Sequence, residues 1–172
     1  EEFLRLSRVL ARLGIRKVRV TGGEPLLRAG VVSFIARLRA IEGLEDIAIT
    51  PNGYLLPEKA QELAAAGSPR ITVSLDSLDP AKFARITRTP ASYEKVMAGM
   101  QAALDAGLKP VKVNIVLVRG FNDDEIVEFA RLARQRDLVV RFIEFMPLDA
   151  DHTWSPDRVV TAREIVATIS PV

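Results

Sequence analysis

The chain has 172 residues, 48% hydrophobic and 27% charged, which is the length and composition of a globular protein with one hydrophobic core. It contains no cysteine and one histidine, His152, which excludes disulfide bridges, thiolate nucleophiles, cysteine-ligated metals and a histidine-rich metal site. The net charge is only +2, and no basic stripe, secretory signal or membrane-length apolar run is visible. We therefore expect a cytoplasmic protein that binds neither nucleic acid nor a membrane.

The first part of the chain alternates predicted helices and strands. The spacing of Phe3, Leu6, Leu10 and Leu13 predicts a helix over residues 1–13, which Gly14 ends. The elements expected next are a strand at 16–21, a helix at 31–41, a strand at 46–50 and a helix that Pro57 opens and Gly67 ends.

The second part continues this alternation. The expected elements are a strand at 70–75, a short helix from Asp79-Pro80, a longer helix at 92–106, a strand at 111–118, a helix, a strand at 138–145 and a last helix at 161–169. Asn122 precedes Asp123, Asp124 and Glu125, so we expect Asn122 to cap the helix before the last strand and the acidic residues to fill its first turn.

Strands and helices joined by short connections predict parallel strands with right-handed crossovers. The strand at 111–118 is apolar or β-branched almost throughout, as expected where helices cover a sheet. The sequence therefore predicts an α/β fold with five strands, in a barrel-like or an open sheet.

Polar residues and glycines follow the first three predicted strands, at the edge where parallel α/β folds bind ligands. They are Gly22-Gly23-Glu24-Pro25 after the first strand, Thr50 and Asn52-Gly53 after the second, and Ser74, Asp76 and Ser77 after the third. Consecutive glycines allow positive φ and a close approach of the backbone to a ligand. Each group taken alone is equally typical of an ordinary turn or a helix N-cap.

Cations also lie on three predicted strands. Lys17 and Arg19 share one face of the first strand, Lys112 and Asn114 share one face of the fourth, and Arg141 lies on the fifth. Their convergence on one cavity would favour a polyanionic ligand such as a triphosphate. The alternative is internal pairing of Arg19, Lys112 and Arg141 with Glu24, Glu144 and Asp76.

Several motifs resemble a known family. The Gly-Gly-Glu-Pro, Thr-x-Asn-Gly and Val-Ser-Leu-Asp-Ser runs are similar to the core of the radical S-adenosylmethionine (SAM) superfamily. Four longer runs resemble, more narrowly, the GTP 3′,8-cyclase family of molybdenum cofactor biosynthesis: 19–28 (RVTGGEPLLR), 107–114 (GLKPVKVN), 120–125 (GFNDDE) and 141–149 (RFIEFMPLD).

The resemblance implies a parent enzyme that converts GTP to 3′,8-cyclo-7,8-dihydro-GTP and uses S-adenosylmethionine and two [4Fe-4S] clusters. It implies that Gly23, Ser74 and Met146 contact S-adenosylmethionine, with Gly22 and Glu24 in the same loop. It implies that Arg19, Thr50 and Lys112 contact GTP, and the strand period adds Arg141 and Asn114 on the same cavity. No residue of this chain is assigned a catalytic role.

The sequence departs from the family in ways that lower the expected activity. Both family cysteine sets are absent, and Pro51 stands where the family usually has a second Thr. The chain begins at the helix after the family's first strand, so we expect a partial TIM-like (β/α) barrel without that strand, with a core at 1–148 and the start of a C-terminal extension at 149–172. We expect this piece to be inactive, and its open strand edge to make it marginally stable or self-associating, for instance as a homodimer.

Three alternatives remain open from sequence. Another radical SAM enzyme, such as a peptide-modifying maturase, would not need the cations Arg19, Lys112 and Arg141. A cluster-free module could use the same barrel to bind a nucleotide or a protein. An aldolase-type barrel is compatible with the fold, since neighbouring cations can activate a lysine such as Lys112.

Overall fold

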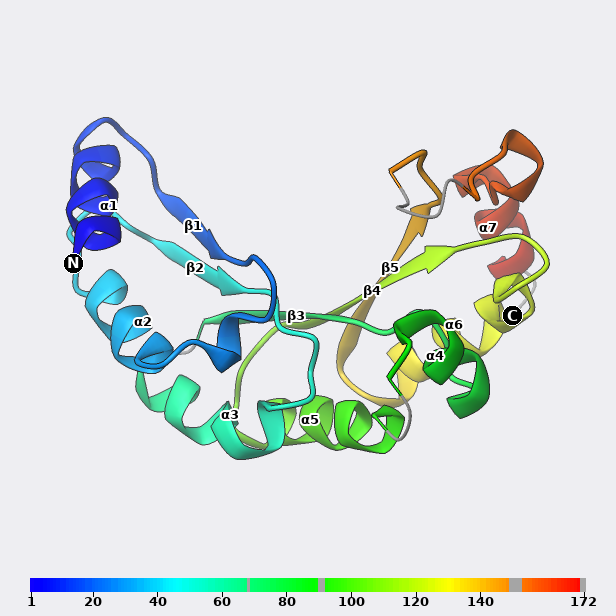
Figure 1. Ribbon diagram of the computed structural model, residues 1–172, viewed down its shortest axis with the longest axis horizontal. Coiled ribbons are helices and arrows are strands. Elements are labelled where there is room, and N and C mark those ends of the chain that lie inside the picture. The colour runs from blue at the N-terminus through cyan, green and yellow to red at the C-terminus, as the bar shows by residue number, and fades with distance from the viewer. Residues whose placement is uncertain (68, 90–91, 149–152, 171–172) are drawn as a thin grey trace. The chain divides into compact units, whose positions relative to one another are not determined.

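Five strands alternate with helices along the chain in the computed structural model, which describes residues 1–67, 69–89, 92–148 and 153–170 (Figure 1). The strands are β1 (Lys17–Val20), β2 (Asp46–Ile49), β3 (Arg70–Ser74), β4 (Val111–Leu117) and β5 (Leu138–Glu144). The helices are α1 (Glu2–Arg12), α2 (Val31–Arg39), α3 (Leu56–Ala65), α4 (Pro80–Thr87), α5 (Tyr93–Asp105), α6 (Ile126–Gln135) and α7 (Ala162–Ile169). Short 3₁₀ turns are η1 (Pro25–Leu27), η2 (Asp123–Glu125) and η3 (Pro156–Arg158).

The strands follow one another in the sheet in chain order, β1-β2-β3-β4-β5. β1 pairs parallel to β2 with Arg19 opposite Ala48, and β2 pairs parallel to β3 with Ala48 opposite Arg70. This confirms the predicted α/β fold, and each strand ends within one or two residues of its expected bounds. The chain forms two compact units, unit 1 (Glu1–Val73 and Lys95–Val111) and unit 2 (Ser74–Glu94 and Lys112–Val172).

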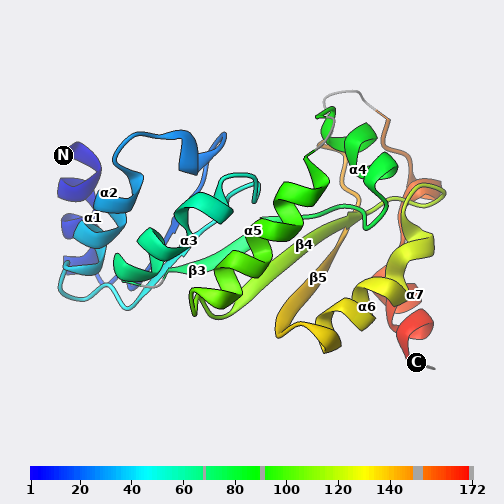
Figure 2. The ribbon, with the colours of Figure 1, turned by 90° about the horizontal axis from the view of Figure 1, so that it is seen from below.

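In unit 1, α1, α2 and α3 form a row in chain order (Figure 2), and α2 packs on β2. The predicted helix at α1 is confirmed, and Gly14 follows it with φ of 96°. The apolar side chains that gave the helical spacing are nevertheless exposed, among them Phe3 at 62% and Leu13 at 76%, while Leu4 and Ala11 are buried. The apolar stripe of α1 is therefore separate from the face that packs against unit 1.

A close contact fixes the loop after β2 against α5. A Cβ atom at Gly99 of α5 would lie 2.3 Å from the carbonyl oxygen of Gly53, and one at Gly53 would lie 3.0 Å from Val73 Cγ1. Gly53 has a φ of 89°, which glycine adopts without strain. Both glycines are thus required by packing or by backbone conformation. The helix after this loop, α3, begins at Leu56, one residue before the expected Pro57.

In unit 2, α6 packs against both β5 and α7. Along β4, fully buried side chains (Val113, Ile115 and Leu117) alternate with half-buried ones, so that one face is covered and the other is partly open. Phe129 of α6 packs edge-on against Phe142 of β5. An antiparallel bridge between Val118 and Val159 joins the end of β4 to the segment before α7.

The predicted capping role of Asn122 is wrong. The side chain of Asn122 makes no cap bond, and the residues expected in the first helical turn form η2, so that α6 begins only at Ile126. Asn122 is instead completely buried. A buried amide must find its partners in the interior, and its partners here belong to other parts of the backbone.

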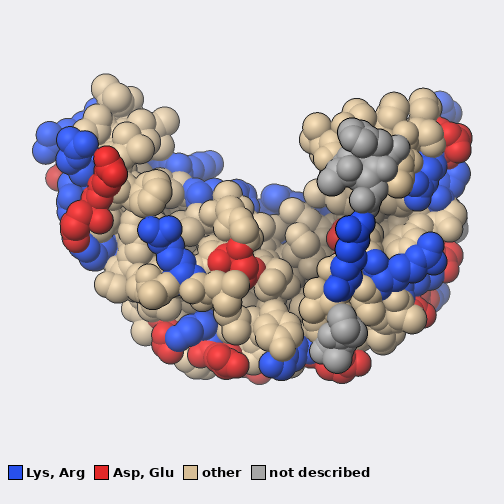
Figure 3. All heavy atoms as spheres, viewed as in Figure 1, with Lys and Arg blue, Asp and Glu red and all other residues tan. Residues whose placement is uncertain are grey.

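No helix among the described residues is long and apolar enough to cross a membrane. On the face drawn in Figure 3, Lys and Arg side chains are interspersed with Asp and Glu. This matches the charge pattern expected from the sequence.

Candidate functional site

The loop after β1 presents backbone to open space. Gly22 and Gly23 have φ of 99° and 44°, which confirms the predicted left-handed conformation. No atom lies within 4 Å of the position that a Cβ would take at either glycine. Because L side chains are strained at such φ values and glycine is not, the loop exposes its own N–H and C=O groups on this side.

Glu24 fastens this loop to the loop after β2. One carboxylate oxygen accepts the N–H of Leu26 at 2.9 Å, and the other accepts the N–H of Asn52 at 2.6 Å. The first bond caps η1, and Asn52 in turn accepts the N–H of Tyr54 through its side chain at 3.0 Å. Glu24 therefore sets the geometry of both loops.

Arg19 lies across the carboxyl end of unit 1. Its Nη1 donates to Thr50 Oγ1 at 3.0 Å and to Thr72 Oγ1 at 3.4 Å. The structure thus brings together Arg19 and Thr50, two of the predicted GTP residues, and adds Thr72, which is 1% exposed and which sequence analysis missed. Within the described residues Arg19 makes no other hydrogen bond, so Nε and Nη2 keep donors for an anionic ligand.

In unit 2, Ser74 is the last residue of β3 and its side chain is exposed. Lys112 and Asn114 lie on the half-buried face of β4, as the two-residue period predicted. The N–H of Leu75, next to Ser74, donates to the carbonyl oxygen of Asn114 at 3.0 Å. The segment after Ser74 is therefore anchored beside Asn114.

The side-chain oxygen of Asn114 is buried and has no hydrogen-bond donor among the described residues. A buried acceptor without a donor is destabilising by about 1–3 kcal/mol. Such an atom is typical of a position where a ligand supplies the missing donor.

The end of β5 is joined to the following segment. Arg141 is exposed on β5, and Met146 is 51% exposed just beyond it. Glu144 Oε1 accepts the N–H of Ala162 at 2.7 Å, and Trp154 Nε1 donates to the carbonyl oxygen of Phe145 at 2.9 Å. The indole of Trp154, to which sequence analysis gave no role, thus has a structural one.

The carboxylates offered as internal partners for the cations are engaged by backbone. Glu24 and Glu144 accept the N–H groups named above, and Asp76 accepts the N–H of Val116 at 2.7 Å. Burial raises the pKa of Asp76, and this hydrogen bond opposes the shift. The convergence of Arg19 with Lys112 and Arg141 stays a prediction, because these side chains belong to different units.

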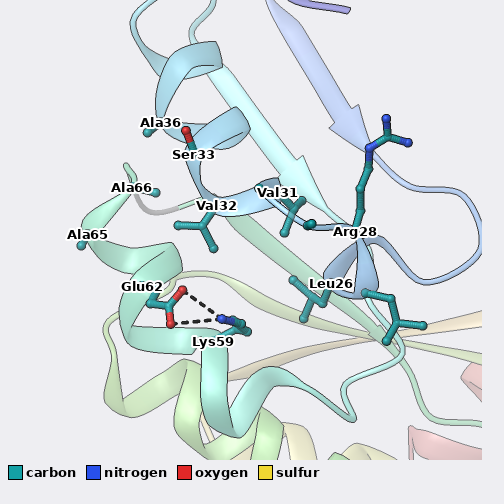
Figure 4. A pocket seen from close by; sticks show the side chains of 13 residues that line it. Leu26, Arg28, Val31, Val32, Ser33, Ala36, Lys59, Glu62, Ala65 and Ala66 are labelled. Carbon is teal, nitrogen blue, oxygen red and sulfur yellow. Dashed lines mark hydrogen bonds and ion pairs between the residues drawn. The ribbon is translucent and has the colours of Figure 1, made fainter. Parts of the chain in front are cut away.

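A groove of about 780 Å³ in unit 1 runs between α2 and α3 (Figure 4). Its lining is largely apolar, with Lys59 Nζ bonded to both Glu62 oxygens at 3.1 Å on the α3 side. None of the predicted ligand residues lines it. We assign it no part in the candidate site.

No group of three or more His, Cys, Asp or Glu side chains among the described residues could hold a metal ion. With no cysteine in the sequence, the chain has no thiolate for an iron–sulfur cluster. The candidate site is therefore a binding surface of glycine backbone, hydroxyls and cations.

Residues 1–133 match the family model of the radical SAM superfamily. The chain is 47% identical over 170 residues to a GTP 3′,8-cyclase from Heliobacterium modesticaldum, and this alignment covers 99% of the chain and 52% of the relative. It is 48% identical over 165 residues to a GTP 3′,8-cyclase from Thermodesulfovibrio yellowstonii, over 96% of the chain and 51% of the relative. The chain thus spans about half the length of these relatives.

Two solved structures resemble the fold. A radical SAM methyltransferase from Sphaerobacter thermophilus superposes with a TM-score of 0.69 at 19% identity, covering 97% of this chain and 52% of that one. Coproporphyrinogen III oxidase (HemN) from Escherichia coli, a radical SAM enzyme, superposes with a TM-score of 0.62 at 14% identity, covering 99% and 44%. At these identities the likeness concerns the fold alone, and it confirms the predicted fold class.

Proposed function

We propose, from the premise that this chain belongs to the radical SAM superfamily, that the full-length protein converts GTP to 3′,8-cyclo-7,8-dihydro-GTP in molybdenum cofactor biosynthesis. The observation that carries this proposal is the similarity to GTP 3′,8-cyclases along nearly the whole chain. The cations at the strand ends support the same substrate, because a triphosphate needs several of them.

We propose that Gly22, Gly23, Glu24, Ser74 and Met146 bind S-adenosylmethionine. The open space beside the two glycines and the exposed Ser74 hydroxyl suit the polar methionine end of the cofactor, and the exposed thioether of Met146 suits its adenine. When bound, the cofactor supplies the radical chemistry that no side chain replaces. The protein's own share is to orient the ligands and to place charge beside them.

We propose that Arg19, Thr50, Lys112 and Arg141 bind GTP. Arg19 is held by two threonine hydroxyls with donors to spare, which is the geometry of a guanidinium prepared for phosphate. The acceptor of Asn114 fits a hydroxyl or amino group of a ligand bound beside β4.

The residues of this chain do not fit an iron–sulfur cluster, because no cysteine is present. We propose that these 172 residues alone are inactive and that the clusters belong to other parts of the full-length protein. The division into a core at 1–148 and an extension at 149–172 belongs to the same proposal, although 149–152 lie outside the described residues.

Equilibrium binding of GTP to the full-length protein tests the proposal. Lys112→Ala should raise the GTP dissociation constant about tenfold, the effect of losing one charged hydrogen bond to phosphate. Lys109→Ala, an exposed lysine just before β4, is the matched control and should leave the constant unchanged. Equal effects of the two substitutions would contradict the assignment, and failure of the wild-type protein to bind GTP would contradict the proposed function.

A further inference from the structure

We infer that Asn122 and Glu125 are positioning residues of the S-adenosylmethionine site, which fix the segment after Ser74 and with it the direction of the Ser74 hydroxyl. The inference rests on the proposed function. Both residues come from the run at 120–125, for which the sequence offered only a capping role.

The backbone ladder of β3 and β4 gives way to side chains just beyond Ser74. The last backbone bond joins Leu75 N–H to the carbonyl of Asn114 at 3.0 Å. The next donor along β4, the N–H of Val116, bonds to the side chain of Asp76 at 2.7 Å. A carboxylate stands where a strand would offer a carbonyl, so the geometry here depends on side chains.

Asn122 joins the two strand ends at this point. Its Nδ2 donates to the carbonyl of Asp76 at 2.6 Å and to that of Val116 at 2.9 Å, and its Oδ1 accepts the N–H of Val118 at 2.8 Å. One buried primary amide thus satisfies two acceptors and one donor. An isosteric carboxylate lacks both donors and would set its charge against the two carbonyls.

Glu125 holds the next residues of the same segment. Its carboxylate accepts the Ser77 hydroxyl at 2.8 Å and 3.0 Å and the N–H of Leu78 at 2.5 Å. Lys82 Nζ lies 3.1 Å from Glu125 Oε1 and also pairs with Asp124, so the charge of this 8% exposed residue is compensated. The run at 120–125 therefore grips residues 76–78 at two points.

The two proposed ligands should depend differently on this grip. Ser74 lies two residues before Asp76, at the point where ladder bonding ends. Lys112 lies inside β4, four residues before Val116, where the strand itself sets its position. Loosening the grip should therefore weaken binding of S-adenosylmethionine and spare that of GTP.

The experiment measures the dissociation constants of S-adenosylmethionine and GTP, each alone, on the full-length, cluster-loaded protein, together with its melting temperature. Asn122→Asp should raise the S-adenosylmethionine constant about tenfold and the GTP constant less than about twofold. Glu125→Gln keeps an acceptor for Leu78 and should raise the first constant about threefold. Asp123→Ala and Thr161→Ala are the controls, because each removes a capping bond in unit 2 without touching residues 76–78.

Each outcome decides the question. A selective loss of S-adenosylmethionine binding, absent from controls of similar melting temperature, supports the inference. Unchanged binding by folded Asn122→Asp, or a parallel loss of both ligands, overturns it, and Glu125→Gln is judged by the same criteria should Asn122→Asp not fold. A wild-type protein that binds neither ligand overturns the proposed function and this inference with it.

Discussion

Units 1 and 2 each use a glutamate to fasten one loop to another at the ends of their strands. In unit 1, Glu24 is half-buried and reaches Asn52, 28 residues along the chain. In unit 2, Glu125 is buried, is neutralised by Lys82 and reaches Leu78, 47 residues away. In both units the loop that carries proposed ligand residues is held by a side chain from another loop, so local turn chemistry alone does not define it.

The loops of unit 1 rest on close packing, and the largest effect should appear there. Gly99→Ala would place a methyl group against the carbonyl of Gly53. Overpacking of this kind costs up to about 3 kcal/mol of unfolding free energy, which denaturant titration would measure. Gln101→Ala on the same helix is the control, and an equal loss in both variants would show that the loop does not depend on this contact.

The amino end of the unit 1 strands offers a contrast between stability and binding. Arg70 forms two bonds to the carboxylate of Asp46, one of them at 2.6 Å from Nε to Oδ1, and both side chains are less than a third exposed. Asp46→Asn should lower the unfolding free energy by about 1–2 kcal/mol. Ligand affinities should not change, because ligands bind at the opposite, carboxyl end; a loss of GTP affinity would contradict this separation.

The support of Arg19 by threonine can be tested directly. Thr72→Val removes one hydroxyl acceptor at constant size, and Arg19 keeps Thr50. We expect about threefold weaker GTP binding, from the loss of one long hydrogen bond, and unchanged affinity for S-adenosylmethionine. Thr87→Val, whose hydroxyl bonds only within α4, is the control in the same titration.

The smallest expected effect concerns acid stability in unit 2. Hydrogen bonds from the backbone and hydroxyl of Thr161, followed by the bond from Arg119, lower the pKa of Glu164 from 4.5 to about 2. Since the unfolded chain binds this proton at higher pH, the stabilising contribution of Glu164 is complete above pH 4.5 and is lost as the pH falls toward 2. Melting temperatures between pH 6 and 2 should fall less steeply for Glu164→Gln than for wild type, with Glu2→Gln as control; identical slopes would refute this.

The sequence predicted the unit 1 loops well and the support in unit 2 poorly, for a physical reason. Gly22, Gly23 and Glu24 are adjacent, so turn chemistry and family resemblance both point to them. Asn122 also belongs to a recognisable run, but its partners lie 46 residues back at Asp76 and within β4. An Asn before acidic residues is locally indistinguishable from an N-cap, and only the fold shows that its amide is buried.

Thr72 and α1 illustrate the same limit. The threonine stands in an ordinary β-branched strand, and only the parallel register places its hydroxyl near Arg19. The apolar spacing of α1 correctly gave a helix, but period alone does not say which of two neighbouring apolar faces is covered.

The open space around Gly22 means that handedness, and not room, restricts this position. Its φ of 99° disfavours an L-amino acid, yet nothing obstructs a methyl group there. A D-alanine introduced by chemical synthesis would therefore match the native backbone while an L-alanine would strain it. Mirror-image substitution would also stiffen the unfolded chain, which glycine leaves unusually free.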